Sequence, residues 1–131
     1  PAGFNAMVFR STCSLTIGSP AGGAVLLHGS VSTRHMASGS RAFATFTATQ
    51  DGVTTNIAPL GLTGARALSH SFDSASSFFV VNHAIDFVHQ PTASSPITYA
   101  VAVAGPSGPI DVNLDVPCVI QASELNVPLS P

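Results

Sequence analysis

Charged side chains are scarce in this chain. Four basic and six acidic residues occur among 131, and none of the basic residues is a lysine. An average soluble domain of this length carries about 33 charged residues, roughly a quarter of the total. Because surface charge keeps a protein soluble and monomeric, we expect much of this surface to be covered by other subunits. The deficit favours an assembly component over a free-standing enzyme.

Basic residues are too few and too dispersed for binding nucleic acid. Arg10, Arg34, Arg41 and Arg66 form no cluster in the sequence, and the formal net charge is −2. Phosphate binding needs clustered lysine and arginine side chains. No nucleic-acid partner is therefore expected.

Long apolar runs are also missing. The longest unbroken run of large aliphatic or aromatic residues is Phe78-Phe79-Val80-Val81, far short of the ~20 residues that span a bilayer. The first twenty residues lack the basic start and apolar stretch of a signal peptide. We expect no membrane partner. Two alternatives stay open before Pro1: a signal peptide that was removed, or an initiator methionine that was removed, which would make the chain a cytoplasmic product.

Cysteine occurs only twice, at Cys13 and Cys118. Two cysteines are too few for a disulfide framework. Both lie in segments with a strand pattern, so antiparallel neighbours would be able to bring them together. We favour two reduced, buried cysteines, because free cysteine behaves as a small hydrophobe.

Helical periodicity is absent, and alternation with a period of two takes its place. Met7, Phe9, Cys13, Leu15 and Ile17, for example, share one parity. Such alternation, interrupted by glycine, proline and serine, is typical of half-buried antiparallel strands. We predict strands over 7–17, 24–33, 41–49, 53–60, 65–72, 77–88, 97–104, 110–114 and 118–125, the sixth being the clearest and the fifth the weakest.

These short, evenly spaced strands predict an all-β fold, an antiparallel β-sandwich or jelly roll of about eight strands. Gln50-Asp51-Gly52 carries the Asp-Gly signal of a tight hairpin turn between two of them. We expect a single domain over residues 7–125, an N-terminal arm over 1–6 and an extended C-terminal tail over 126–131.

Catalytic residues are not predicted. Serine, histidine and aspartate lie closest together in Ser69-His70-Ser71-Phe72-Asp73, but a G-x-S-x-G nucleophile elbow is absent. A polar turn is the better interpretation of that segment.

A metal site within one subunit is not predicted either. His83 and His89 share a strand face, but six residues separate them by roughly 20 Å. His28 and His35 have no aspartate, glutamate or cysteine beside them at ligand spacing. A trimer that brings three copies of one histidine to its axis remains an alternative, and we expect no cofactor. His83, with apolar neighbours on its own face, is interpreted as a neutral interior or interface histidine.

Aromatic rings lie on both faces of some predicted strands, as in Phe43 with Phe46 and Phe78 with Phe79. A strand with one face in water has no use for an aromatic ring on that face, so these strands are expected to be buried on both sides. Either a core position explains the outward rings, or they contact neighbouring subunits. The candidate residues for a subunit or shell interface are Phe43, Phe46, Phe78, Phe79, Val81, His83, Phe87, Tyr99 and Val101. Asp86 points to the opposite side of its strand from Ile85 and Phe87, either to solvent or to an arginine.

The chain from about Ser38 to Leu125 resembles a known class of small domains. The resemblance rests on the segments SGSRAFATFTATQDGVTTNIAP, SSFFVVNHAIDFVHQ, SPITYAVAVAGPSGPIDVNL and PCVIQASEL. These are similar to the jelly-roll heads of the tumour-necrosis-factor-like and complement-head-like class, in the versions found on phage and other viral structural proteins. The resemblance implies a compact homotrimer without catalytic residues, acting as a capsid decoration (cement) protein or as the receptor-binding knob of a fibre.

No heptad or collagen-like repeat precedes the first predicted strand, which favours decoration of a shell over a stalked knob. The expectation is a non-enzymatic protein on the capsid surface of a virion, assembled in the host cytoplasm, with the major capsid protein or another virion protein as partner. One alternative is a receptor- or glycan-binding knob of a tail fibre, for which Tyr99 with Asn82 or His89 would be the first candidates. Another is a secreted carbohydrate-binding or hydrolytic β domain, for which His70 and Asp73 would be tested.

Overall fold

A computed structural model describes residues 9–18, 20, 22–35, 41–59, 66–72, 79–105, 111–112 and 117–125. At residues 35, 72, 79, 111 and 112 it describes the backbone but not the side chain. Within these ranges the chain forms strands and no helix. The strands are β1 (Arg10–Ile17), β2 (Val25–His35), β3 (Arg41–Gln50), β4 (Val53–Asn56), β5 (Ser69–Phe72), β6 (Phe79–His89), β7 (Ile97–Ala104), β8 (Asp111–Val112) and β9 (Val119–Glu124). Each lies within a segment predicted from alternation or extends it by no more than two residues. The predicted arm (1–6) and tail (126–131) lie outside the described residues.

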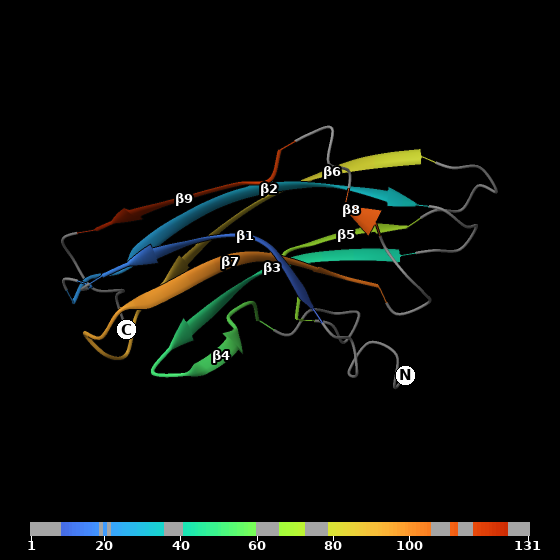
Figure 1. Ribbon diagram of the computed structural model, residues 1–131. Helices are drawn as coiled ribbons and strands as arrows, with labels where there is room; N and C mark the ends of the chain where they lie inside the picture. Colours follow the sequence, from blue (N-terminus) through green and yellow to red (C-terminus); the bar gives the residue numbers. More distant parts are fainter. Residues whose placement is uncertain are drawn as a thin grey trace.

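The strands form two antiparallel sheets stacked face to face (Figure 1). One sheet has the order β1-β7-β3-β4, with β5 also paired to β3; the other has the order β6-β2-β8, with β9 also paired to β2. The predicted all-β antiparallel sandwich is therefore confirmed. A jelly-roll connectivity in particular stays a prediction.

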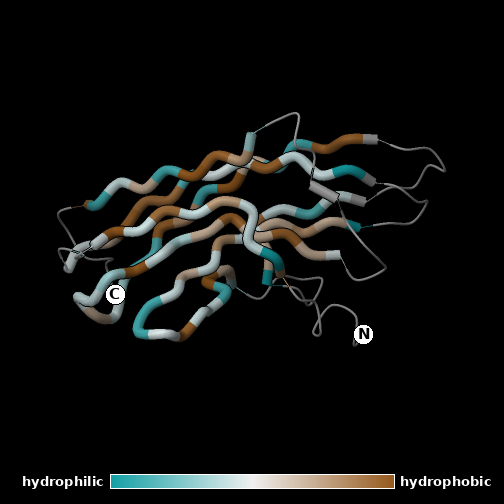
Figure 2. Tube along the Cα trace, viewed as in Figure 1, coloured by the Kyte–Doolittle hydropathy of each residue, from teal (hydrophilic) through white to brown (hydrophobic). Residues whose placement is uncertain are grey.

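The hydrophobic core lies between the sheets, because alternate residues of each strand point inward. The five-stranded sheet supplies Phe46, Tyr99 and Val101, and the four-stranded sheet supplies Leu27 and Ile85, all at most 2% exposed. Figure 2 shows the resulting interchange of hydrophobic and hydrophilic positions along the strands.

The middle of the five-stranded sheet is buried on its outer face as well. Thr45, Ala100 and Ala102 point away from the core and are nevertheless buried. Thr45 donates a hydrogen bond to Oδ1 of Asn56 at 2.8 Å, and Nδ2 of Asn56 donates to the carbonyl of Arg66 at 2.7 Å. The prediction that strands carrying rings on both faces are buried on both sides is confirmed for β3.

Cys13 and Cys118 are joined by a disulfide, so the prediction of two reduced cysteines is wrong. Their Cα atoms lie 5.9 Å apart although 105 residues separate them in sequence. Cys13 lies on β1 of one sheet and Cys118 immediately precedes β9 of the other. The bond therefore ties the two sheets together, and no local pattern in the sequence reveals that these edges meet.

A β-bulge in β1 also departs from simple alternation. The register shifts between Ser11 and Cys13, so that Arg10 pairs with Val103 and Cys13 with Val101. Residues directly opposite in an antiparallel pair share a face. Phe9 therefore does not continue the inward face of Cys13, as its parity had predicted.

Candidate functional site

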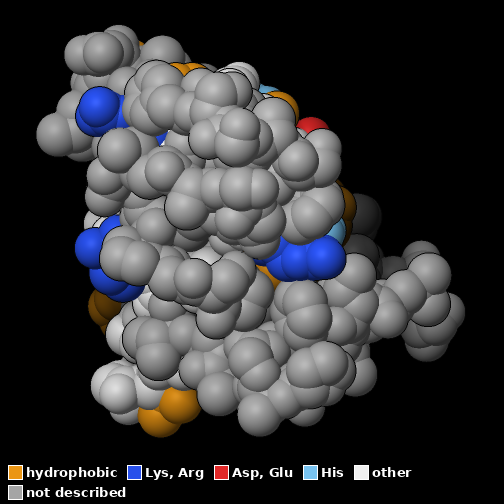
Figure 3. All heavy atoms as spheres, turned by 90° about the vertical axis from the view of Figure 1, so that its right-hand side faces the viewer, with side chains coloured by type: hydrophobic (Ala, Val, Ile, Leu, Met, Phe, Trp, Pro, Cys, Tyr) orange, Lys and Arg blue, Asp and Glu red, His pale blue; other side chains and the backbone are white. Residues whose placement is uncertain are grey.

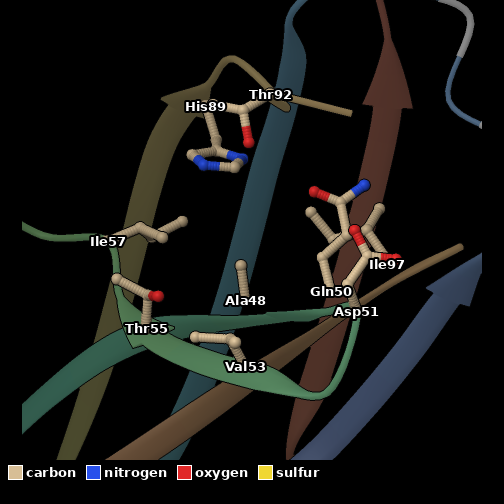
Figure 4. A pocket seen from close by; sticks show the side chains of 9 residues that line it. All are labelled: Ala48, Gln50, Asp51, Val53, Thr55, Ile57, His89, Thr92 and Ile97. Atoms are coloured by element: carbon tan, nitrogen blue, oxygen red, sulfur yellow. The ribbon is translucent and has the colours of Figure 1, made fainter. Parts of the chain in front are cut away.

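The described part of the chain contains a pocket of about 380 Å³ at one end of the sandwich. It lies between the β3–β4 hairpin on one side and the end of β6 with the following loop on the other (Figure 4). We call it the His89 pocket. Its lining residues are Ala48, Gln50, Asp51, Val53, Thr55, Ile57, His89, Thr92 and Ile97.

The hairpin that forms one wall is built by the predicted Asp-Gly turn. Asp51 and Gly52 both have positive φ, at 53° and 79°, as a type I′ hairpin turn requires. Gln50 pairs with Val53 across this turn. The tight turn projects Asp51, Val53 and Thr55 along the rim of the pocket, and Val53 is 63% exposed.

The opposite wall is held to the hairpin by the side chain of Gln50. Its Nε2 donates to the carbonyl oxygens of Ala93 and Ser95, at 3.1 and 2.9 Å. These hydrogen bonds occupy the amide nitrogen. Figure 4 shows the amide oxygen of Gln50 on the side facing His89.

His89 projects into the pocket above Ala48 (Figure 4). Its Nδ1 lies 2.8 Å from the hydroxyl of Tyr99, and the two rings meet edge to face with centroids 5.5 Å apart. Burial, followed by the Glu124 carboxylate, raises the pKa of Tyr99 to about 12. Burial lowers the pKa of His89 below its ordinary value. At neutral pH the pair is therefore a phenol beside a neutral imidazole.

The direction of this hydrogen bond follows from the cost of a buried donor without an acceptor. Nδ1 of His89 is the acceptor that the described residues offer to the Tyr99 hydroxyl, so the hydroxyl donates and Nδ1 accepts. The proton of the neutral imidazole is then on Nε2. His89 thus presents an N–H donor to the pocket.

Most of the predicted interface residues lie in the interior of the single chain. Phe43, Phe46, His83, Tyr99 and Val101 are at most 1% exposed. Side chains with so little exposed surface have almost nothing left to bury against another subunit, so the core alternative explains their burial. Val81 and Phe87 are partly buried on the inward face of β6. Phe78 lies outside the described residues, and the side chain of Phe79 is not described.

His83 belongs to a polar cluster between the sheets. Its Nδ1 lies 2.7 Å from Oγ of Ser69, and its Nε2 lies 3.1 Å from Oγ1 of Thr33.

His70, by contrast, stacks on Phe43 with ring centroids 4.4 Å apart. Ser69–Phe72 is strand β5, within the strand predicted over 65–72, and not a polar turn, so Ser69 and His70 point to opposite faces. Asp73, the other candidate of the hydrolytic alternative, lies outside the described residues. The ring of His83 is too deeply buried for a substrate to reach it.

Of the alternative glycan residues, Tyr99 and His89 do come together, at 2.8 Å, whereas Asn82 does not join them. Tyr99 is buried in the core and Asn82 is exposed on the outer face of β6, while only His89 lines the pocket. The alternation of β6 points Asn82 and His89 to opposite faces of the sheet.

The outer face of the four-stranded sheet is largely exposed, although Ser32 is buried, and it is poor in charge. It comprises the outward side chains of β2, β6 and β9, and we call it the outer β2 face. Four large hydrophobic side chains are exposed among the described residues, and three of them lie here: Leu26, Val80 and Val119. Val88, directly opposite Leu26, and Ala84, directly opposite Ser30, add further apolar surface.

Asp86 lies in the middle of the outer β2 face. Its partner is not an arginine, which we had considered, but His28, at 2.7 Å between Nδ1 and Oδ1. The two residues are directly opposite on β6 and β2, so the pair is a cross-strand contact within one chain.

Arginine side chains in the end-on view of the molecule lie at separate positions (Figure 3). No group of three or more histidine, cysteine, aspartate or glutamate side chains suited to a metal ion is found in the described ranges. Nor do those ranges contain a helix long and apolar enough to cross a membrane.

Comparison with protein-family models, curated proteins and solved structures gave no match to this chain.

Proposed function

We propose that this chain is a non-enzymatic viral structural protein, which decorates and stabilises a capsid shell as a homotrimer. The observation that carries the proposal is the outer β2 face. Antiparallel sheets with one wet face normally turn polar side chains outward. Here Leu26, Val80 and Val119 are exposed at 41%, 44% and 39% among the polar side chains of the face.

Few charged side chains on this face would lose contact with water if another subunit covered it. The described outward side chains of β2, β6 and β9 include only two formally charged residues, Arg34 and Asp86, and Asp86 is already paired with His28. Burial of apolar surface contributes about 25 cal/mol per Å² before the costs of association. The proposed occupant of the face is a second copy of the chain, and the His28–Asp86 pair would set the register of the contact more than its affinity.

The disulfide supports a location outside a reducing cytosol. Disulfides persist on virion surfaces and in other oxidising environments, and they are rare in cytosolic proteins. A protein exposed on a released particle fits this condition. Assembly would begin in the host cytoplasm, with the Cys13–Cys118 bond forming after release.

Native mass spectrometry of the purified chain tests the proposal. We expect a trimer at micromolar concentration, and the same mass at low and high salt because little of the contact is screened Coulomb attraction. Leu26→Lys and Val119→Lys should shift the population to monomer. Val53→Lys is the matched control, because Val53 is exposed but lies on the β3–β4 hairpin.

A wild-type monomer at these concentrations would overturn the trimer. A trimer that survives Leu26→Lys and Val119→Lys would exclude the outer β2 face as its interface. In purified particles the chain should be about as abundant as a shell subunit. A handful of copies per particle would indicate a tail location instead.

A further inference from the structure

We propose that the His89 pocket binds one sugar unit of a neutral glycan. The pocket has the size of a small-molecule site: about 380 Å³, where such sites usually enclose about 300–1,000 Å³. It is also formed by segments that hydrogen bonds hold together, since Gln50 joins the hairpin to Ala93 and Ser95. A site of this kind is largely preformed.

The apolar lining fits the carbon face of a sugar ring. Ala48, Ile57 and Ile97 line the pocket, and Val53 adds a methyl surface at its rim. Val53 is the most exposed large hydrophobic side chain among the described residues, at 63%. Ala48 and Ile97 are already buried, so a pyranose ring placed here would remove mainly the surface of Val53 and Ile57 from water.

The polar lining offers both donors and acceptors. Nε2–H of His89 donates, because the Tyr99 hydroxyl occupies Nδ1. The amide oxygen of Gln50 accepts, because its nitrogen is bonded to the 93–95 backbone. Thr55 and Thr92 carry hydroxyls that do either. Sugar hydroxyls also donate and accept, so a polyhydroxylated ligand matches this set better than a purely apolar one.

Charge in the pocket selects against anions. Asp51 is the one formally charged residue among the nine that line it, and it carries a negative charge. The lowered pKa of His89 keeps that side chain neutral at physiological pH. An acidic sugar or a phosphate would meet a carboxylate without a compensating cation, whereas a neutral sugar would use the same carboxylate as an acceptor.

The His89 pocket and the outer β2 face share no residue, so the inference does not depend on the proposed trimer. Loss of sugar binding and loss of the trimer would be separate results.

NMR titration of the ¹⁵N-labelled full chain tests this inference. The probes are the methyl glycosides of glucose, galactose, mannose and N-acetylglucosamine, with the methyl glycoside of N-acetylneuraminic acid as the anionic comparison. We expect saturable shifts of amide signals within residues 50–57 and 89–97 for at least one neutral glycoside, with a millimolar Kd. The anionic glycoside should bind more weakly.

Two adjacent threonines provide a matched pair of variants. Thr55→Val removes a hydroxyl that lines the pocket and should weaken binding by about two- to tenfold. Thr54→Val removes a hydroxyl on the opposite face of β4, where it contacts Thr49 at 2.7 Å, and should leave the Kd unchanged. The inference is overturned by absence of saturable shifts with all four neutral glycosides, by shifts confined to other surfaces, by tighter binding of the anionic glycoside, or by equal effects of the two variants.

Discussion

The buried hydroxyl of Tyr99 lies 2.8 Å from Nδ1 of His89 and joins β7 of the five-stranded sheet to β6 of the four-stranded sheet. Because the hydroxyl donates to Nδ1, the remaining ring proton of His89 points into the pocket. This one contact links the packing of the sandwich to the chemistry of its open end.

Acidification should destabilise the fold through His89. Burial lowers the pKa of His89 in the folded chain, so the unfolded chain takes up a proton first as the pH falls below about 6.5. The stability that depends on neutral His89 is thus complete above that pH and is lost as the pH falls through the folded pKa. Urea unfolding from about pH 7 to pH 5 should show this decline.

His89→Gln isolates that contribution, because a glutamine amide oxygen can still accept from Tyr99 while carrying no titrating group. The pKa of His70 is also lowered, by burial and by Arg41. Because His70 is present in both proteins, its contribution to the pH dependence cancels in the comparison. The variant should have a shallower loss of unfolding free energy toward acid. Parallel pH profiles for the two proteins would refute this role of His89.

Reduction of the Cys13–Cys118 bond should lower stability. The bond closes a loop of 105 residues between the two sheets, and loss of such a bond costs about 2–5 kcal/mol. A Cys13→Ser, Cys118→Ser variant should unfold at correspondingly lower urea. Alkylation of the native chain should find free thiols only after reduction. Two reactive thiols in the untreated native protein would contradict the bond.

Gly29 should not tolerate a side chain. A Cβ at this position would lie 2.7 Å from Cγ2 of Val101 and 2.9 Å from Cε1 of Phe46, and both neighbours are fully buried. Gly29→Ala should therefore destabilise the chain by about 1–3 kcal/mol in urea unfolding. Gly18→Ala is the control, since nothing lies within 4 Å of its Cβ position. Equal stability of the two variants would show that the core around Gly29 repacks freely.

The β3–β4 turn should depend on its glycine. Gly52 has a φ of 79°, which costs a residue with a Cβ about 1–2 kcal/mol. We expect Gly52→Ala to lose that amount of unfolding free energy, and Asp51→Asn to be nearly neutral because asparagine tolerates the left-handed region. If both variants match the wild type, the hairpin contributes little to the stability of the fold.

Strand positions were predictable because alternation is a local property of the chain. The segment 97–104 was predicted with the bounds that β7 has, and Asp51-Gly52 forms the predicted turn. Errors arose where one residue changed the register. The bulge between Ser11 and Cys13 moved Phe9 off the expected face, and no composition signal marks such a bulge.

Site geometry was not predictable in the same way, because it depends on which distant strands meet. Ser69 contacts His83 and not its neighbour His70, since adjacent residues on a strand point to opposite faces. The sequence showed His89 as one member of a strand face. The position of His89 near the end of a predicted strand, on the inward face and next to a loop, was a signal that could have indicated its role. The pocket itself also needs the β3–β4 hairpin on the opposite side, which that signal does not reveal.

Composition and alternation in the sequence alone determined an all-β chain with few charges and a tight Asp-Gly hairpin. Tertiary structure decided that Cys13 meets Cys118, that Phe43 and Phe46 are both interior, and that three of the four exposed large aliphatic side chains among the described residues lie on the outer β2 face. The physical reason is that side-chain direction along a strand follows from neighbouring residues. Strand partners and sheet stacking, in contrast, depend on packing between segments that are far apart in the chain.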